Sequence, residues 1–424
     1  MASLTLFQQS EVVRKKKFPE WRTQKFGVLL DFIQKGEVQR IGERDFRIPA
    51  ELILGGDAGT YDPQMGDMGR GSMPQGLAML QSYYPMRLNF EMDKLAIKAT
   101  SNPNVAIENP FLKCIAKGFQ EFRLYRDKWY HNDGTAVIGT ATAHSSGSGV
   151  SVYTMDSVTG TQWLRRGQPV TIYNNGLTTI RTTAARIVSL DTAALTVTLN
   201  LIVPSASATD KFCFSGVSGS SPAGPRGIGY WINSTSSGLV ANIDRAVEPQ
   251  VNAKTVNAAN SPYITEMVMG LYDKILNDRA EVASEVMAIA SPNVRAQAYN
   301  NMMAIQAIFL DSTSAQAVDR LPPLKGRNNF MYGGVPHTLD IHTYKDRTHF
   351  LVPSLWGRAV LAEEDFFQTD GVSGEKGRFI QLYGASGGPA AGTWFGLTCD
   401  ENPYTIDIGA QGLVYGQPMA NYHT

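Results

Sequence analysis

The composition of the chain changes abruptly at about residue 136, and this change most limits how the chain can fold. From residue 136 to residue 221 the sequence holds one lysine and no glutamate, and Thr, Ser, Val and Gly dominate. Strand-like segments follow one another at roughly ten-residue spacing, a pattern typical of a small barrel or sandwich. These segments are "SVYTMDSV", "QPVTIYNN", "RTTAARIVSLD", "LTVTLNLIV" and "DKFCFSG". The stretches "HSSGSG" and "SGVSGSSPAGPRG" read as small, flexible edges. We therefore predict an inserted all-β domain at residues 136–225.

Helical patterns outside this segment make the whole chain an α+β sequence. The segment "NPFLKCIAKGFQEFRLYRDKWYHNDG" opens with Asn109 as a cap and Pro110 in the first turn. A single apolar stripe runs along it: Phe111, Leu112, Ile115, Phe119, Phe122 and Trp129. Two later helices are each predicted to open on a Ser-Pro pair, at Ser261 and at Ser291. The second of them follows a predicted buried strand at residues 286–290.

A long glycine-rich stretch between two strand patterns predicts a projecting arm. "DFRIPAELILGG" reads as one strand and "LAMLQSYYPMRLNFEMD" as the other. Between them Gly55 to Gly76 holds seven glycines and two prolines, which excludes regular structure. A lone two-stranded arm is marginal in water and needs a surface to lie on. We expect contacts between subunits from residues at its tip and its second strand: Met65, Met68, Arg70, Met73, Tyr83 and Tyr84.

The N-terminal segment is basic and the C-terminal segment is acidic. Residues 1–47 carry ten Lys/Arg against six Asp/Glu, whereas residues 360–424 carry two against eight. The two ends could meet within a subunit or between subunits, or both could be ordinary solvated faces. The basic run is Arg14, Lys15, Lys16 and Lys17. We predict DNA-facing or arm contacts for this run, and a merely solvated arm remains the alternative. Residues 21–36 follow with helical spacing and end at Gly36.

Bulk properties favour neither a membrane protein nor a disulfide-stabilised one. The formal net charge is zero, so whole-chain charge gives no case for nucleic-acid or membrane binding. The three cysteines are an odd number without a CxxC pair, which predicts single buried thiols. The N-terminus lacks the apolar region of a signal peptide, and no apolar run reaches the roughly 18–20 residues of a membrane helix.

Three of the six histidines lie within "HTLDIHTYKDRTHF", which raises the question of a metal site. The alternation predicts a hairpin in which Asp340 and His342 share a face. His337 has the opposite parity, and His349 falls on the returning strand. A catalytic metal wants about three ligands that converge on one point. Polar residues on the surface of a hairpin explain the pattern at least as well, so we predict no metal and no other cofactor.

The pentapeptide "GASGG", Gly384 to Gly388, matches the serine elbow of hydrolases. Asp400 or Asp407 and then His423 follow Ser386 in the order that a triad needs. However, the elbow requires a helix directly after its serine, and "GGPAAG" starts one poorly. A glycine-rich turn is the better interpretation, and we predict that the chain is not an enzyme.

The order of these elements resembles the major capsid protein of tailed bacteriophages, whose Johnson (HK-ninety-seven) fold also occurs in encapsulin shells. Besides the arm strands and the long helix, "NDGT" and "GIGYWI" resemble a paired family motif, with the β segment spliced between them. "SPYITEMVMGLYDKI", "VMAIASPNVRAQ" and "MYGGVPHTLDI" are similar to the axial domain. The resemblance implies five parts. They are an N-terminal arm (1–45), an E-loop (46–100), a peripheral domain with a spine helix (101–135 and 226–255, rejoined by part of 375–424), the β insertion (136–225) and an axial domain (256–374).

The resemblance further implies hexamers and pentamers that close an icosahedral virion shell around double-stranded DNA, without sequence specificity. The implied partners are a portal and separate scaffolding and cement proteins. No lysine lies between Phe46 and Asp93, so the covalent E-loop crosslink of some members is not carried over. The β insertion is expected to decorate the surface or to make contacts between subunits. Two alternatives remain open at this point, an encapsulin-like shell for protein cargo and a β-rich tail or adhesin protein.

Overall fold

The computed structural model describes residues 28–53, 75–93, 110–147, 149–215, 223–310, 329–366, 380–383 and 389–419. The chain divides into two compact units. One is built from segments within residues 1–31, 83–128 and 360–402, and the other from segments within residues 32–82, 129–359 and 403–424. Among the described residues, no helix combines the length and the apolar character that a membrane span needs.

The first unit combines the long helix with a four-stranded sheet. Its elements are α4 (Pro110–His131, whose last turn enters the second unit), β4 (Tyr84–Asp93), β18 (Trp356–Phe366), β19 (Ile380–Tyr383) and β20 (Pro389–Thr405). Helix α4 lies where the apolar stripe predicted it, and its Phe122 is fully buried. A Cβ at Gly118 would lie 2.9 Å from the Phe90 ring of β4, so the helix packs closely on this strand.

An arginine on α4 ties this unit together through a buried ionic network. Arg126 donates from Nε and Nη2 to both carboxylate oxygens of Glu401 on β20, at 2.6 and 2.7 Å. Its Nη1 donates to Glu364 on β18. Exposed Arg123, one helical turn earlier, pairs with the other oxygen of Glu364. One buried guanidinium therefore links the helix to two strands of the sheet.

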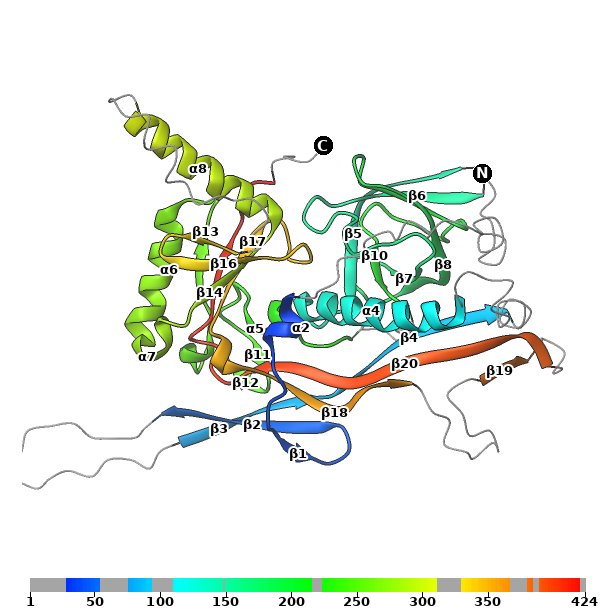
Figure 1. The fold of residues 1–424 in the computed structure, drawn as a ribbon, viewed down its shortest axis with the longest axis horizontal. Helices are drawn as coiled ribbons and strands as arrows, with labels where there is room; N and C mark the ends of the chain where they lie inside the picture. The colour runs from blue at the N-terminus through cyan, green and yellow to red at the C-terminus, as the bar shows by residue number, and fades with distance from the viewer. Residues whose placement is uncertain are drawn as a thin grey trace, which may run out of the picture. The chain divides into compact units, whose positions relative to one another are not determined.

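The second unit is organised around a six-stranded mixed sheet in the order β13-β21-β17-β14-β16-β15. The strands are β13 (Lys254–Asn257), β14 (Met287–Ala290), β15 (Asn329–Tyr332), β16 (Val335–Leu339), β17 (Arg347–Leu351) and β21 (Gly412–Tyr415). Figure 1 shows α6 (Thr265–Asp278) and α8 (Pro292–Leu310) beside this sheet. Val268, Leu271 and Ile275 of α6 are buried in one apolar core with the inner strands.

Smaller elements of the second unit connect these parts. They are β1 (Gln39–Ile41), α5 (Ile228–Trp231), β11 (Leu239–Val240), β12 (Ile243–Asp244), α7 (Ala280–Ala283) and the 3₁₀ turns at Pro249–Val251 and Pro353–Leu355. Helix α2 (Val28–Phe32) belongs to the first unit except for its last residue. The helix predicted over residues 21–36 is described only as α2.

The two predicted Ser-Pro helix starts differ in outcome. The Ser261 cap is wrong, because α6 begins at Thr265 with Ile264 at the N-cap. The cap at Ser291 is confirmed, since its Oγ accepts from the backbone of Val294.

The structure describes the base of the predicted arm. Strands β2 (Asp45–Ile53) and β3 (Gln75–Ser82) pair antiparallel over nearly their whole length, with β1 on the outer side of β2 (Figure 1). The glycine-rich tip lies outside the described residues. The second strand pattern breaks at Tyr83, and β4 leaves the arm to pair with β20. The arm is therefore one strand pair, and the later half of the pattern belongs to the other sheet.

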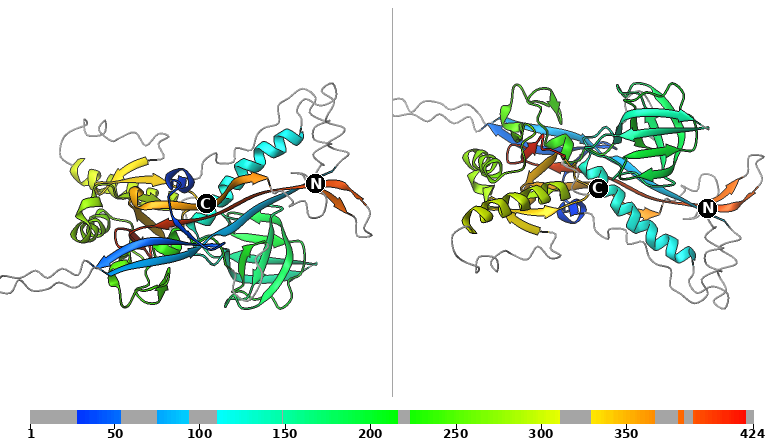
Figure 2. Two further views of the ribbon diagram at one scale, coloured as in Figure 1. Left: turned by 90° about the horizontal axis from the view of Figure 1, so that it is seen from below. Right: turned by 90° about the horizontal axis from the view of Figure 1, so that it is seen from above.

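The serine- and threonine-rich segment forms a closed six-stranded barrel, visible in both views of Figure 2. Its strands are β5 (Val137–Gly147), β6 (Val150–Met155), β7 (Pro169–Tyr173), β8 (Ile180–Asp191), β9 (Thr196–Leu199) and β10 (Lys211–Phe214). The last five correspond to the five predicted segments. The first was missed, because "HSSG" looks like a linker but is the end of β5. Two of the cysteines are free and buried, and burial raises the pKa of the Cys213 thiol of β10 to about 12.

The two ends of the barrel segment meet at one point. The backbone of Gly224 donates to the carbonyl of Gly134 at 2.8 Å, and Asp133 and Arg226 form an isolated bridge. The returning chain passes directly over the last turn of α4, where a Cβ on Gly227 would lie 2.2 Å from the carbonyl oxygen of Tyr130. Only a residue without a side chain allows this close approach.

We expect Gly227→Ala to lower the free energy of unfolding by about 1–3 kcal/mol, because the methyl group would overlap rigid backbone. The φ of Gly227 is −79°, so the effect would come from the overlap and not from a left-handed backbone. Gly270→Ala in α6 is the matched control, since a Cβ there meets nothing within 4 Å. It should stabilise the protein by about 0.5–1 kcal/mol through helix propensity. Urea unfolding of both variants tests this, and equal effects would contradict it.

Candidate functional site

The histidine-rich stretch is buried, and it is not a hairpin. Strand β14 lies between β16 and β17, pairing parallel with the first and antiparallel with the second. Strand β16 ends at Leu339, and His337, His342 and His349 are all buried. The prediction of surface-facing polar residues is therefore wrong. The sequence pattern could not reveal the third strand, because β14 comes from about fifty residues earlier in the chain.

The sheet register places two of these histidines on opposite faces. His337 is the partner of Ala288, and His349 is the partner of the next residue, Ile289. Successive residues of a strand point to opposite sides, so the two imidazoles cannot converge on one ion. His337 is also fully engaged, with Nε2 2.7 Å from the Tyr263 hydroxyl and Nδ1 2.8 Å from the carbonyl of Val335. His337 and His349 therefore lie in separate environments.

Asp340 forms a buried ionic cluster with two histidines. His131, at the end of α4, places Nε2 2.9 Å from Asp340 Oδ2. The backbone of His342 donates to Asp340 Oδ1 at 2.8 Å. Burial alone would raise the pKa of Asp340, but the charge and the hydrogen bond of His131 outweigh it and hold the pKa below its ordinary value. The cluster fixes the end of α4 to the loop that follows β16.

A loop of the barrel packs on the same loop. Trp163 is fully buried and donates from Nε1 to the carbonyl of His342 at 3.0 Å. Its ring lies 5.2 Å from that of Tyr344, and the backbone of Lys345 donates to Val158 at 3.2 Å. The barrel is therefore held to the loop that follows β16 by the indole of Trp163 and by a backbone hydrogen bond, as well as by its chain connections.

We expect Trp163→Phe to cost about 1–3 kcal/mol more than Trp129→Phe. Both changes shorten a largely buried indole, but only the first leaves a buried carbonyl without its donor. Among the described residues, Nε1 of Trp129 has no hydrogen-bond partner. Urea unfolding gives the two costs. Hydrogen exchange should show faster opening of residues 340–346 in the Trp163 variant alone. Equal costs would mean that the indole hydrogen bond contributes nothing.

The remaining predicted site residues fall into three groups. Arg14, Lys15, Lys16, Lys17, Met65, Met68, Arg70 and Met73 lie outside the described residues, as do Ser386 and His423. Tyr83 is buried, whereas Tyr84 is partly exposed on β4, so of the two Tyr84 offers more surface for a neighbour. Asp407, a candidate triad acid, is instead paired with Arg279 at 2.6 Å. The contact roles of the arm residues stay predictions.

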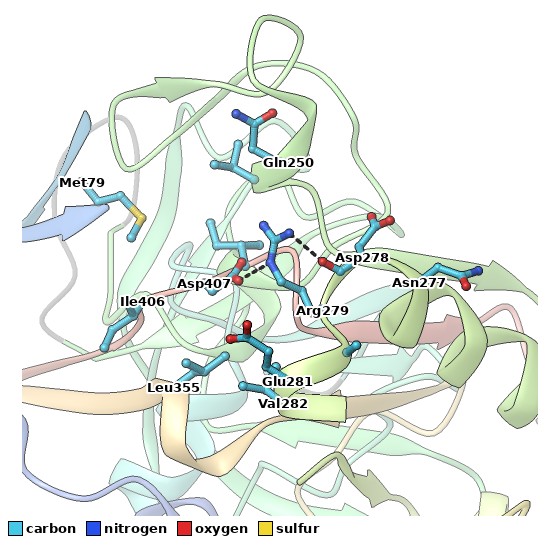
Figure 3. Close-up of a pocket in the computed structure, with 13 residues that line it drawn as sticks. Met79, Gln250, Asn277, Asp278, Arg279, Glu281, Val282, Leu355, Ile406 and Asp407 are labelled. Carbon is cyan, nitrogen blue, oxygen red and sulfur yellow. Dashed lines mark hydrogen bonds and ion pairs between the residues drawn. The ribbon is translucent and has the colours of Figure 1, made fainter. Parts of the chain in front are cut away.

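A groove that the sequence did not predict lies in the second unit, between the arm base and the end of α6 (Figure 3). Its volume is about 640 Å³, within the range of pockets that accept small ligands or a few side chains. The side chains of Arg279, Glu281 and Asp407 converge there, with Ile406 and Met79 at one end. The groove joins residues more than 300 positions apart, so local pattern gives no signal for it.

Comparison with solved structures finds chains of similar architecture. The cyanophage A-1(L) capsid asymmetric unit matches with a TM-score of 0.53 at 10% identity, over 98% of this chain and 99% of that chain. The holo-SrpI encapsulin complex from Synechococcus elongatus PCC 7942 matches at 0.45 and 9% identity, over 100% and 99% of the two chains. The capsid of the native GTA particle matches at 0.45 and 8%, over 98% and 100%. No protein-family profile and no curated protein matches the sequence. The chain has the fold of phage capsid chains, and this prediction is confirmed.

Proposed function

We propose that this chain is the major structural subunit of an icosahedral phage head, assembling as hexamers and pentamers around double-stranded DNA. The observation that carries the proposal is the fold match to a cyanophage capsid chain over nearly the full length of both chains. Low identity means that the match concerns fold, so the assembly itself is what needs testing.

The architecture supports this proposal part by part. We assign β2 and β3 to the base of the E-loop, α4 to the spine helix, and the six-stranded sheet with α6 and α8 to the axial domain. The barrel is assigned as an insertion into the peripheral domain, since its two ends meet at Gly134 and Gly224. Projecting elements of this kind bury their surface only against neighbours. Many modest contacts of ordinary interface size can then hold a shell without covalent links.

The proposal is tested by expressing the protein alone and examining it by electron microscopy and size-exclusion chromatography. Closed shells or hexamer-sized rings are the expected result, with Ser386→Ala assembling as well as the native chain. Particles from infected cells should protect double-stranded DNA from nuclease; protected protein cargo would instead indicate an encapsulin-like shell. A monomer at all concentrations, even with a scaffolding protein supplied, would overturn the proposal.

A further inference from the structure

We propose that the groove beside Arg279 binds the basic segment Val12–Phe18 of a second copy of this chain. The inference rests on the proposed shell function only in requiring that copies meet. The sequence alone did not decide what the basic run contacts. Here we assign it to a contact with protein.

Carboxylates outnumber cations in the lining of the groove. Three carboxylates line the groove, from Asp278, Glu281 and Asp407, against the single guanidinium of Arg279. Arg279 neutralises Asp407, and Lys254 neutralises Asp278 from outside the groove. Glu281 is exposed and forms no ion pair among the described residues, so it keeps an uncompensated negative charge. A cationic ligand is favoured here, and a nucleic-acid phosphate is repelled.

Apolar side chains line the groove beside these charged groups. Ile406 is 48% exposed and lies next to Asp407, with Leu355 and Val282 also lining the groove (Figure 3). An exposed branched side chain in a concave surface gains stability when a partner covers it. The groove therefore suits a ligand that carries cations and apolar side chains together.

The segment "VVRKKKF" has this chemistry. Its four consecutive cations, Arg14 to Lys17, are flanked by Val12 and Val13 on one side and by Phe18 on the other. The first 47 residues carry an excess of positive charge, which would also draw them toward acidic surfaces of neighbours. In an assembly of many copies, the local concentration of this segment near each groove is high, so a weak individual contact is populated.

Crosslinking between two chains that each carry one added cysteine tests the contact. Lys16→Cys in a chain with one size tag is mixed with Asn277→Cys in a chain with another tag, under mild oxidation. Asn277 lines the groove and is exposed, so Glu281 keeps its charge in this test. The control partner is Met269→Cys, an exposed uncharged position on α6. Native chains with the same tags control for the existing thiols. We expect the mixed dimer with Asn277→Cys to form at least about fivefold faster than with Met269→Cys, and added salt to slow it.

Each outcome separates this inference from the shell proposal, because electron microscopy is run on the same samples. Shells without preferential crosslinking would overturn the groove contact and leave the shell function standing. Preferential crosslinking without shells would support the contact and count against the shell. If a chain carrying both cysteines crosslinks within itself at monomer size, the occupant is its own segment and the inference is wrong.

Peptide binding is a second test of the groove contact. A labelled peptide of residues 10–20 should bind the native protein about threefold or more tighter than the Glu281→Lys variant. Equal binding would also overturn the groove contact.

Discussion

Replacing Arg126 with methionine is expected to lower the free energy of unfolding by about 3–5 kcal/mol, because it takes this cation away from the buried carboxylate of Glu401. The side chains of Arg126 and Glu401 are 3% and 1% exposed, and both oxygens of Glu401 accept from the guanidinium. Methionine fills similar space but donates nothing. Glu364 keeps its ion pair with Arg123, so the cost falls mainly on Glu401.

Arg123→Met is the matched control, since the same helix presents this second arginine to the same Glu364. Its side chain is 60% exposed, and an exposed ion pair contributes about 0–1 kcal/mol. Urea unfolding followed by tryptophan fluorescence gives both values. The double variant Arg126→Met/Glu401→Gln should recover part of the loss, because the uncompensated charge is gone. If the two arginine variants lose equal stability, the buried network does not stabilise the first unit.

Much of the fold could be predicted where local pattern determines structure. The helix α4 was found from its apolar stripe, and the five barrel segments were found from their composition and their roughly ten-residue recurrence. The helix starts were less reliable. Ser261-Pro262 looks like a cap, yet α6 begins at Thr265, since the backbone of Tyr263 is held by Gln297 from α8 and its hydroxyl by His337. Contacts with residues distant in the sequence therefore determine where α6 begins.

The candidate sites were predicted less well, because they depend on contacts between distant segments. The alternation around Asp340 predicted a hairpin, but β16 ends at Leu339, β14 separates the two strands, and Trp163 of the barrel covers the loop. No local signal connects residue 163 with residue 342. The groove likewise joins Met79, Arg279 and Ile406, three segments that meet only in the folded chain. The sequence does show that residues 1–47 carry an excess of positive charge, opposite in sign to Glu281 in the groove.

Acidification from pH 6.5 to pH 4 is expected to destabilise the protein through its buried histidines. Burial lowers the pKa of His337 to about 4, against an ordinary value near 6.5. Burial, together with the charges of Arg347 and His131, also holds the pKa of His349 well below its ordinary value. In this window the unfolded chain binds protons that the folded chain does not. The free energy of unfolding therefore falls by about 1.4 kcal/mol per pH unit for each group, or about 3 kcal/mol for His337 across the window.

His337→Gln isolates the contribution of one ring. Glutamine can still donate to Val335 and accept from Tyr263, the two partners of the imidazole, but it does not titrate. Urea unfolding at half-unit intervals from pH 7.5 to pH 4 should give a shallower slope for this variant below pH 6.5, and His337→Gln/His349→Gln a shallower slope again. Above pH 7 the slopes should coincide. Asp340, whose pKa is lowered from 3.8, begins to add to the loss only at the acid end of this window, and it does so equally in all three proteins. Curves that stay parallel down to pH 4 would mean that the buried rings take up protons in the folded chain as readily as in the unfolded one.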